Sequence, residues 1–136
     1  METRKLGLIN EKISLLGFGC MRLPITGDNS ADINYPLAEQ MIDRAVGQGV
    51  NYFDTAWMYH GEKSEEFIGH ALKKYPRDSF YLADKLPPWN IETSEDVDRL
   101  FNEQRRRCGV EYFDFYLLHS LNKANWEIIK KFNVYE

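Results

Sequence analysis

Four residues whose side chains can hold or move a proton lie at or just beyond the ends of short apolar runs. They are Asp54, Tyr59, Lys85 and His119. If the runs are parallel strands, their carboxyl ends meet at one edge of a sheet, where α/β proteins place their chemistry. An acid, a phenol, an amine and an imidazole would then share one site. Taken singly, each has a plainer explanation: a loop cap, a packed aromatic, an exposed lysine or a core histidine.

The spacing of apolar and turn-forming residues predicts the elements that position these side chains. A β-hairpin is expected over residues 4–15, with its turn at Asn10 and Glu11. Strands are predicted at 15–19, 50–54, 80–85 and 113–119. Helices are predicted at 36–48, from a cap at Ser64, from Thr93 to Gly109, and from Trp126 onward.

Strands that alternate with helices imply a parallel sheet with right-handed crossovers. No linker or low-complexity segment divides residues 1–136, so we expect one domain of the α/β class. Its order would be the hairpin followed by about four β–α units. The helical pattern of the last segment continues to the end of the chain without a stop signal, which favours a truncated domain.

The composition narrows the classes of partner and location. Hydrophobic residues make up 43% and charged residues 28% of 136 residues, as in ordinary globular domains. The net charge of −4 and the lack of a basic stripe argue against nucleic acid as a partner. Neither a membrane span nor a secretory signal is recognisable. Cys20 and Cys108 form no CxxC pair, so we expect two buried free thiols in a reducing cytoplasm. None of the three histidines has a ligand-type partner nearby in sequence, so no metal site is predicted.

Several segments resemble the aldo-keto reductase family, in the right order and over nearly the whole chain. They are GFGCMRLP (17–24), VNYFDTA (50–56), YHG (59–61), KLP (85–87) and FDFYLLH (113–119). The forms at 21–24 and 122–126 are similar to bacterial members, some of which carry a C-terminal iron–sulfur segment that has no counterpart here. The resemblance implies a (β/α)8 barrel that reduces a small carbonyl compound with NADPH or NADH.

The resemblance also places the family's catalytic tetrad on Asp54, Tyr59, Lys85 and His119. Tyr59 would act as the general acid for the oxyanion that forms as hydride reaches the carbonyl carbon. A free phenol has a pKa of about 10, and a nearby cation lowers it. Lys85 would be that cation, with Asp54 holding it charged and in position. His119 would donate a hydrogen bond to the carbonyl oxygen.

Three further positions are implied by the resemblance to lie against the nicotinamide end of the cofactor. They are Gly19, Cys20 and Met21, just after the first barrel strand. A glycine there allows close approach of the backbone to a ligand. An ordinary turn at the end of a strand explains the same three residues about equally well. The pattern at 17–19 is not a Rossmann fingerprint, because the third glycine is missing and no helix follows directly.

Length is the largest departure from the family. A closed (β/α)8 barrel takes about 250 residues, whereas this sequence predicts about half a barrel. The later loops, which bind the phosphates and adenine of NADP or NAD in the family, have no counterpart, so the cofactor site is expected to be incomplete. Open strand edges favour self-association. The alternatives to an active reductase are therefore an inactive truncated remnant and an interaction module.

Two substitutions add to the departure. Asp84 stands where the family usually has a small neutral residue, and strand alternation points it away from Lys85, toward the helices. A carboxylate buried there is unfavourable unless it is paired. Arg105 falls at an inward-facing position of its helix, and we expect its charged end to turn outward.

Overall fold

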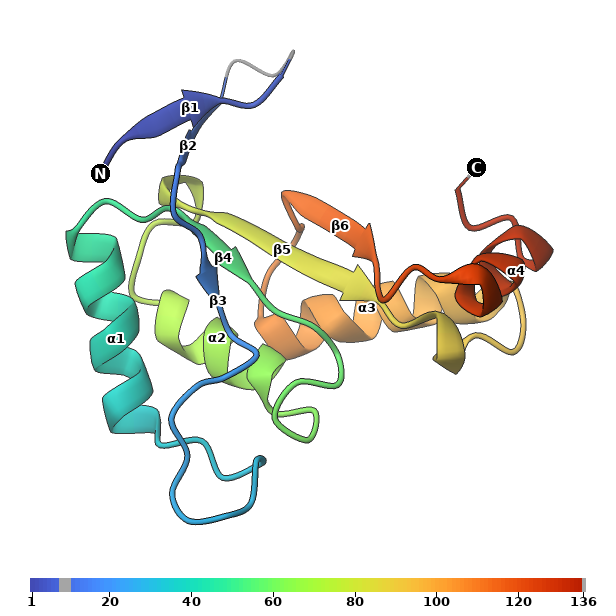
Figure 1. Cartoon of the computed structure of the whole chain (residues 1–136), viewed down its shortest axis with the longest axis horizontal. Coiled ribbons are helices and arrows are strands. Elements are labelled where there is room, and N and C mark those ends of the chain that lie inside the picture. The colour runs from blue at the N-terminus through green and yellow to red at the C-terminus, as the bar shows by residue number, and fades with distance from the viewer. Residues whose placement is uncertain (8–10, 136) are drawn as a thin grey trace.

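The computed structural model describes residues 1–7 and 11–135. Its strands are β1 (Thr3–Lys5), β2 (Lys12–Ser14), β3 (Phe18–Gly19), β4 (Tyr52–Asp54), β5 (Tyr81–Leu86) and β6 (Phe115–Leu118). Its α-helices are α1 (Tyr35–Gly47), α2 (Ser64–Leu72), α3 (Glu95–Cys108) and α4 (Lys123–Lys131). Two 3₁₀ turns, η1 (Arg77–Ser79) and η2 (Pro88–Asn90), flank β5. Figure 1 shows the elements in this order along the chain.

The central sheet is parallel, in the order β3-β4-β5-β6. The register pairs Gly19 with Asp54 and Asp54 with Ala83, so the carboxyl ends of the first three strands lie together. Lys85 pairs with Leu117 on β6. The predicted α/β class with a parallel sheet is therefore confirmed.

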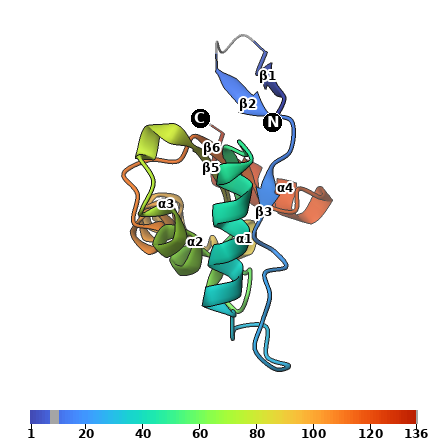
Figure 2. The same cartoon turned by 90° about the vertical axis from the view of Figure 1, so that its left-hand side faces the viewer.

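The core lies between the sheet and the first three helices. Phe53 and Leu82 point from the strands into a cluster with Ile42 of α1 and Phe67 of α2. Figure 2 shows α1, α2 and α3 next to one another beside the strands. The helices α2 and α3 cross closely at Gly69, where a Cβ atom would lie 2.3 Å from the Cys108 carbonyl oxygen. This close crossing fixes α3 relative to β5 and to the strand end that carries Lys85.

The N-terminal hairpin is confirmed as β1 paired antiparallel with β2. Part of its predicted turn, including Asn10, lies outside the described residues. Asn51, just before β4, ties the hairpin to the sheet, because its Oδ1 accepts the Ser14 N–H at 2.8 Å. Its own N–H donates to the Ser14 hydroxyl at 3.1 Å. The strand predicted at 15–19 is shorter than expected, because only Phe18 and Gly19 form β3, while the Leu15 N–H bonds to the Glu2 carbonyl of the hairpin at 3.0 Å.

Two predicted helix caps are wrong in detail. Ser64 is the first residue of α2 and not its cap, since its hydroxyl contacts the Thr55 hydroxyl at 2.9 Å and donates to the Cys20 carbonyl. The helix α3 starts two residues after Thr93, although Asp96 accepts the Thr93 N–H at 2.8 Å, as a capping box requires. The left-handed Gly109 ends α3 as predicted.

The last helix begins earlier and stops sooner than its sequence pattern indicates. Asn122 caps α4 by accepting the Asn125 N–H at 3.0 Å, and the helix starts at Lys123, three residues before the predicted start. The helix ends at Lys131, so the expectation that it continues to the end of the chain is wrong. The helix α4 packs beside η2, next to the carboxyl ends of the strands. None of the described helices is long and apolar enough to cross a membrane.

Candidate active site

Asp54 and Lys85 form an ion pair at the carboxyl edge of the sheet. They come from neighbouring strands, β4 and β5, and the Lys85 Nζ lies 2.6 Å from Asp54 Oδ1. Their side chains are 28% and 13% exposed, so the pair is only partly screened by water. The same Nζ also donates to the Thr55 carbonyl oxygen at 2.7 Å. The lysine is thereby held by two oxygens of the β4 strand end.

Tyr59 reaches this ion pair from the loop that follows β4. Its hydroxyl oxygen is 3.2 Å from Lys85 Nζ, which also lies 4.9 Å from the centre of the tyrosine ring. The loop is shaped by His60 and Gly61, both at positive φ. The His60 ring joins two distant segments, because Nε2 accepts the Leu23 N–H and Nδ1 donates to the Ser30 carbonyl. His60 therefore has a structural role, holding Tyr59 over the strand edge.

His119 completes the group from the loop after β6. The main-chain N–H of His119 donates to the Leu86 carbonyl at 3.0 Å, which extends the β5–β6 pairing by one residue. The imidazole is buried and lies edge-on to Tyr59, with ring centres 5.8 Å apart. Trp89 of η2 packs against its other side at 5.1 Å. Burial first, and then the charge of Lys85, lowers the pKa of His119, so the ring is neutral at neutral pH.

The four side chains thus form one contiguous group, as the parallel arrangement of the strands predicts. A neutral imidazole carries one N–H donor, and the His119 Nδ1 has no hydrogen-bond partner among the described residues. The tyrosine hydroxyl faces an ammonium group that is itself neutralised by a carboxylate. The arrangement can donate a proton from the phenol and stabilise the negative charge left on it.

The three positions predicted to contact a cofactor differ in their exposure to solvent. Gly19 and Met21 are exposed, and a Cβ atom added to Gly19 would meet nothing within 4 Å. Cys20 is fully buried, with its N–H bonded to the Asp54 carbonyl at 2.8 Å. Cys20 therefore forms part of the floor beneath the site, whereas Gly19 and Met21 border open space. Burial and the charge of Asp54 raise the pKa of the Cys20 thiol, and Cys108 is likewise buried and free, as expected.

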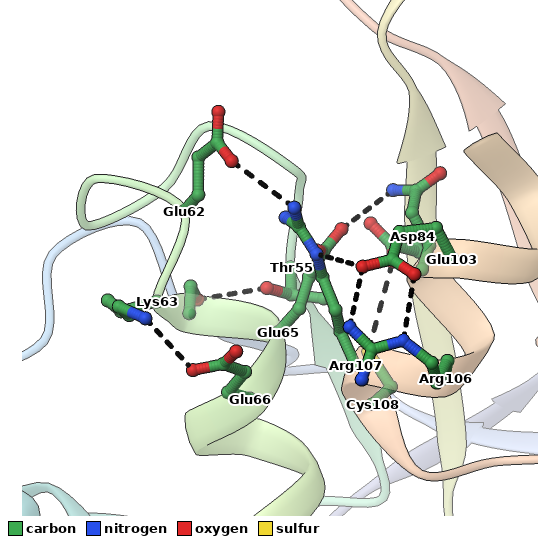
Figure 3. A network of polar contacts seen from close by, with 12 residues as sticks. Thr55, Glu62, Lys63, Glu65, Glu66, Asp84, Glu103, Arg106, Arg107 and Cys108 are labelled. Carbon is green, nitrogen blue, oxygen red and sulfur yellow. Dashed lines mark hydrogen bonds and ion pairs between the residues drawn. The ribbon is translucent and has the colours of Figure 1, made fainter.

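A buried polar network that the sequence did not reveal lies behind the strand end (Figure 3). It joins Glu65 of α2, Gln104 and Arg107 of α3, and Asp84 of β5. Asp84 faces the helices as predicted and is fully buried. The apolar pattern of α3 does not single out Gln104, because its side chain is polar. Its place four residues from both Leu100 and Cys108 nevertheless marks an inward-facing position.

Arg105 occupies an inward-facing position of α3 but hydrogen-bonds within its own helix. The side chain is half-buried and turns back along α3, where Nη1 donates to Asn102 Oδ1 at 3.3 Å. Its guanidinium carbon is 5.7 Å from the centre of the Phe101 ring. Its Nε is buried without a hydrogen-bond partner among the described residues, so the guanidinium turns outward only in part, and it forms no hydrogen bond there with Glu65 or Gln104.

A hollow of about 570 Å³ lies elsewhere, between the C-terminal parts of α2 and α3. Its lining includes Gly69, Phe80 and Arg77. The Arg77 guanidinium is already engaged, because it donates to Asp114 Oδ2 at 2.6 Å and to the Phe80 carbonyl at 3.0 Å. The side chains of Asp54, Tyr59, Lys85 and His119 do not line this hollow; they lie at the carboxyl ends of the strands. In the described part of the chain, no cluster of three or more metal-ligand residues occurs.

Comparisons with known proteins place these observations in a family. Residues 15–132 match the family model described as "Aldo/keto reductase family". The probable aldo-keto reductase 1 of Glycine max is 35% identical over 132 residues, covering 88% of this chain and 36% of that protein. The aldo-keto reductase yakc [NADP(+)] of Schizosaccharomyces pombe is 29% identical, covering 88% of this chain and 36% of that protein.

A solved structure agrees with the sequence matches. The thermostable aldo-keto reductase Tm1743, crystallised with the inhibitor epalrestat, superimposes with a TM-score of 0.77 at 26% identity. The match covers 96% of this chain and 49% of that chain. Such structures are (β/α)8 barrels, and this chain corresponds to part of one, which confirms the predicted fold class. The chain spans little more than a third of the two curated relatives and about half of the solved structure.

Proposed function

The chain belongs to the aldo/keto reductase family, and from that premise we propose that it is an oxidoreductase that reduces an aldehyde or ketone with NADPH or NADH. The observation that carries this proposal is the position of Lys85. Its ammonium group contacts Asp54 at 2.6 Å and the Tyr59 hydroxyl at 3.2 Å. A free phenol is a poor proton donor at neutral pH, and a neighbouring ammonium group favours loss of its proton.

Each side chain has a distinct part in the proposed reaction. Tyr59 donates its proton to the carbonyl oxygen as negative charge develops there. Lys85 stabilises the phenolate that remains, and Asp54 keeps Lys85 charged and fixed. The neutral His119 donates a hydrogen bond to the same carbonyl oxygen, which orients the substrate and shares the developing charge. Trp89, packed on His119, would form one wall for a small carbonyl compound.

The residues next to this group fit the reactive end of a nicotinamide cofactor. Gly19 and Met21 border open space beside Asp54, and nothing occupies the position of a side chain at Gly19. When bound, NADPH or NADH would supply the hydride. We further propose that the chain works in a reducing cytoplasm, which suits its two buried free thiols.

The proposed roles are tested by replacing the ion pair. Lys85→Met and Asp54→Asn should each lower the rate of NADPH-dependent aldehyde reduction by roughly 10²-fold or more, since both weaken the support of the phenolate. Lys74→Met is the matched control, because Lys74, two residues after α2, forms an exposed ion pair with Asp43 of α1. Rates that do not fall in the Lys85 variant would refute the assignment.

A further inference from the structure

Lys85 lies opposite Leu117 in the β5–β6 pairing, but its own peptide groups hydrogen-bond to buried side chains. On β5, Ala83 still pairs with β4, because the Thr55 N–H donates to its carbonyl. Two residues later the β4 chain has turned away into the loop, and the Lys85 peptide groups find other partners. The N–H donates to Asp84 Oδ1 at 2.8 Å, and the carbonyl accepts from Gln104 Nε2 at 3.1 Å.

These two partners belong to one buried network. Gln104 Nε2 also donates to Glu65 Oε1 at 2.8 Å, and its Oε1 accepts the Tyr116 hydroxyl at 2.6 Å. Glu65 is fully buried and binds Arg107, whose Nη1 is 3.1 Å from Oε2. Figure 3 shows the Arg107 side chain among Glu62, Glu65 and Glu103. Every polar end of Gln104 is therefore used, which leaves it one orientation.

The chemistry of Asp84 requires a proton. The carboxyl is fully buried, and its Oδ1 accepts the Lys85 N–H at 2.8 Å. The guanidinium of Arg107 pairs with Glu65, and the ammonium of Lys85 pairs with Asp54. Among the described residues no cation forms an ion pair with Asp84, and burying a carboxylate without such a partner is strongly disfavoured.

The surroundings of Asp84 favour the same protonation state. Burial, followed by the charge of Glu65, raises the pKa of Asp84 well above its usual value. The titratable groups that interact with it are Glu65 from α2, Lys85 on its own strand, Cys108 from α3, Tyr116 from β6, and Cys20 just after β3. Cys108 Sγ is 3.9 Å from Asp84 Oδ2. Burial raises the pKa of the Cys108 thiol, so it stays neutral and adds no charge.

We propose that Asp84 is protonated at neutral pH and that this neutral carboxyl, together with Gln104, positions Lys85. The two side chains fix the Lys85 peptide, and the peptide fixes the side chain whose Nζ bridges Asp54 and Tyr59. Asp84 is a positioning residue in this scheme, since it acts through Lys85. Its consequence for turnover rests on the proposed reductase function, whereas the protonation of Asp84 and the Lys85 geometry do not.

The protonation of Asp84 is tested without any turnover. Isotope-edited infrared spectra, recorded at neutral pH with carboxyl-labelled aspartate, should show the C=O band of a protonated carboxyl. The band should disappear in Asp84→Asn and persist in Asp78→Asn, which alters an exposed acid. Absence of the band in the unaltered chain, or its persistence in Asp84→Asn, would overturn the proposal.

The positioning role is tested by separating the acceptor from the proton. Asp84→Ala removes the acceptor for the Lys85 N–H, whereas Asp84→Asn keeps it. In amide NMR spectra, the Lys85 resonance should therefore shift in Asp84→Ala and return toward its original position in Asp84→Asn. A Lys85 resonance that moves equally in both variants, or in neither, would overturn the role; Asp84→Ser replaces Asp84→Ala if the latter does not fold.

The kinetic readout then separates this inference from the proposed function. In Asp84→Ala we expect kcat to fall by about tenfold to a hundredfold with a smaller change in KM, as for a misplaced catalytic group, and Asp84→Asn should recover most of the loss. An unaltered chain that shows no turnover counts against the reductase proposal alone, because the infrared and NMR outcomes remain decisive. An unchanged kcat in Asp84→Ala would overturn the positioning role.

Discussion

Lys85 holds the site together at the scale of single residues. Its ammonium reaches an acid, a carbonyl and a phenol, and its peptide is held from behind by Asp84 and Gln104. The side chain of Lys85 thus faces the proposed reaction site, and its peptide groups face the buried side chains of Asp84 and Gln104. A side chain fixed from both sides loses little further freedom when a substrate binds, which favours reaction.

Asp84 should make the stability of the chain depend on pH. In the unfolded chain its carboxyl titrates near 3.8, whereas burial keeps it protonated to a higher pH in the folded chain. Over the interval between the two pKa values the folded state binds more protons, so the free energy of unfolding falls as pH rises. Asp84→Asn should flatten this fall in urea denaturation series from about pH 4 to about pH 8. An equally steep fall in the variant would contradict the protonation state.

Arg107 should contribute far more to stability than its neighbour Arg106. Its side chain is 13% exposed, stacks 3.8 Å from the Trp57 ring and neutralises the fully buried Glu65. Arg107→Met leaves that carboxylate without a cation, and such losses are about 3–5 kcal/mol. Arg106→Met, which breaks an exposed pair with Glu103, should change the urea midpoint little. Similar midpoints for the two variants would argue against a buried charge at Glu65.

At the scale of elements, the crossing of α2 over α3 places the network behind β5. Gly69→Ala would put a Cβ atom 2.3 Å from the Cys108 carbonyl oxygen, which is backbone and cannot move freely. We expect a loss of about 1–3 kcal/mol in the free energy of unfolding. Gly47→Ala is the control, because its Cβ would meet nothing within 4 Å and it should stabilise α1 by about 0.5–1 kcal/mol. A harmless Gly69→Ala would show that the two helices can separate.

The elements and the site differ in how well the sequence predicts them. Parallel strands carry their last residues to one edge, so the meeting of Asp54, Lys85 and His119 follows from local pattern alone. The role of Ser64 did not follow, because its hydroxyl contacts Thr55 and Cys20, which only the folded chain brings near. The same holds for the bond from Gln104 to the Lys85 peptide. Local spacing marks which residues face inward but not which polar groups they meet.

The whole molecule presents an open sheet, with β3 and β6 at its two edges. Leu117 of β6 is 42% exposed on the sheet face opposite the helices. Open edges and exposed apolar side chains favour association between copies. We expect concentration-dependent association in sedimentation velocity experiments, weakened by Leu117→Lys and not by Leu121→Lys in a loop. A monomer at all concentrations would contradict this expectation.

The most direct test of the account follows the hydride itself. The purified chain is incubated with an aldehyde and about 1 mM NADPH carrying deuterium at the transferred position of the nicotinamide, and the alcohol is examined by mass spectrometry. We expect one deuterium on the carbinol carbon. The rate at which the deuterated alcohol forms should fall by roughly 10²-fold or more in Tyr59→Phe. It should stay unchanged in Tyr112→Phe, which alters an exposed tyrosine. An alcohol without deuterium, or equal transfer in Tyr59→Phe, would contradict the account.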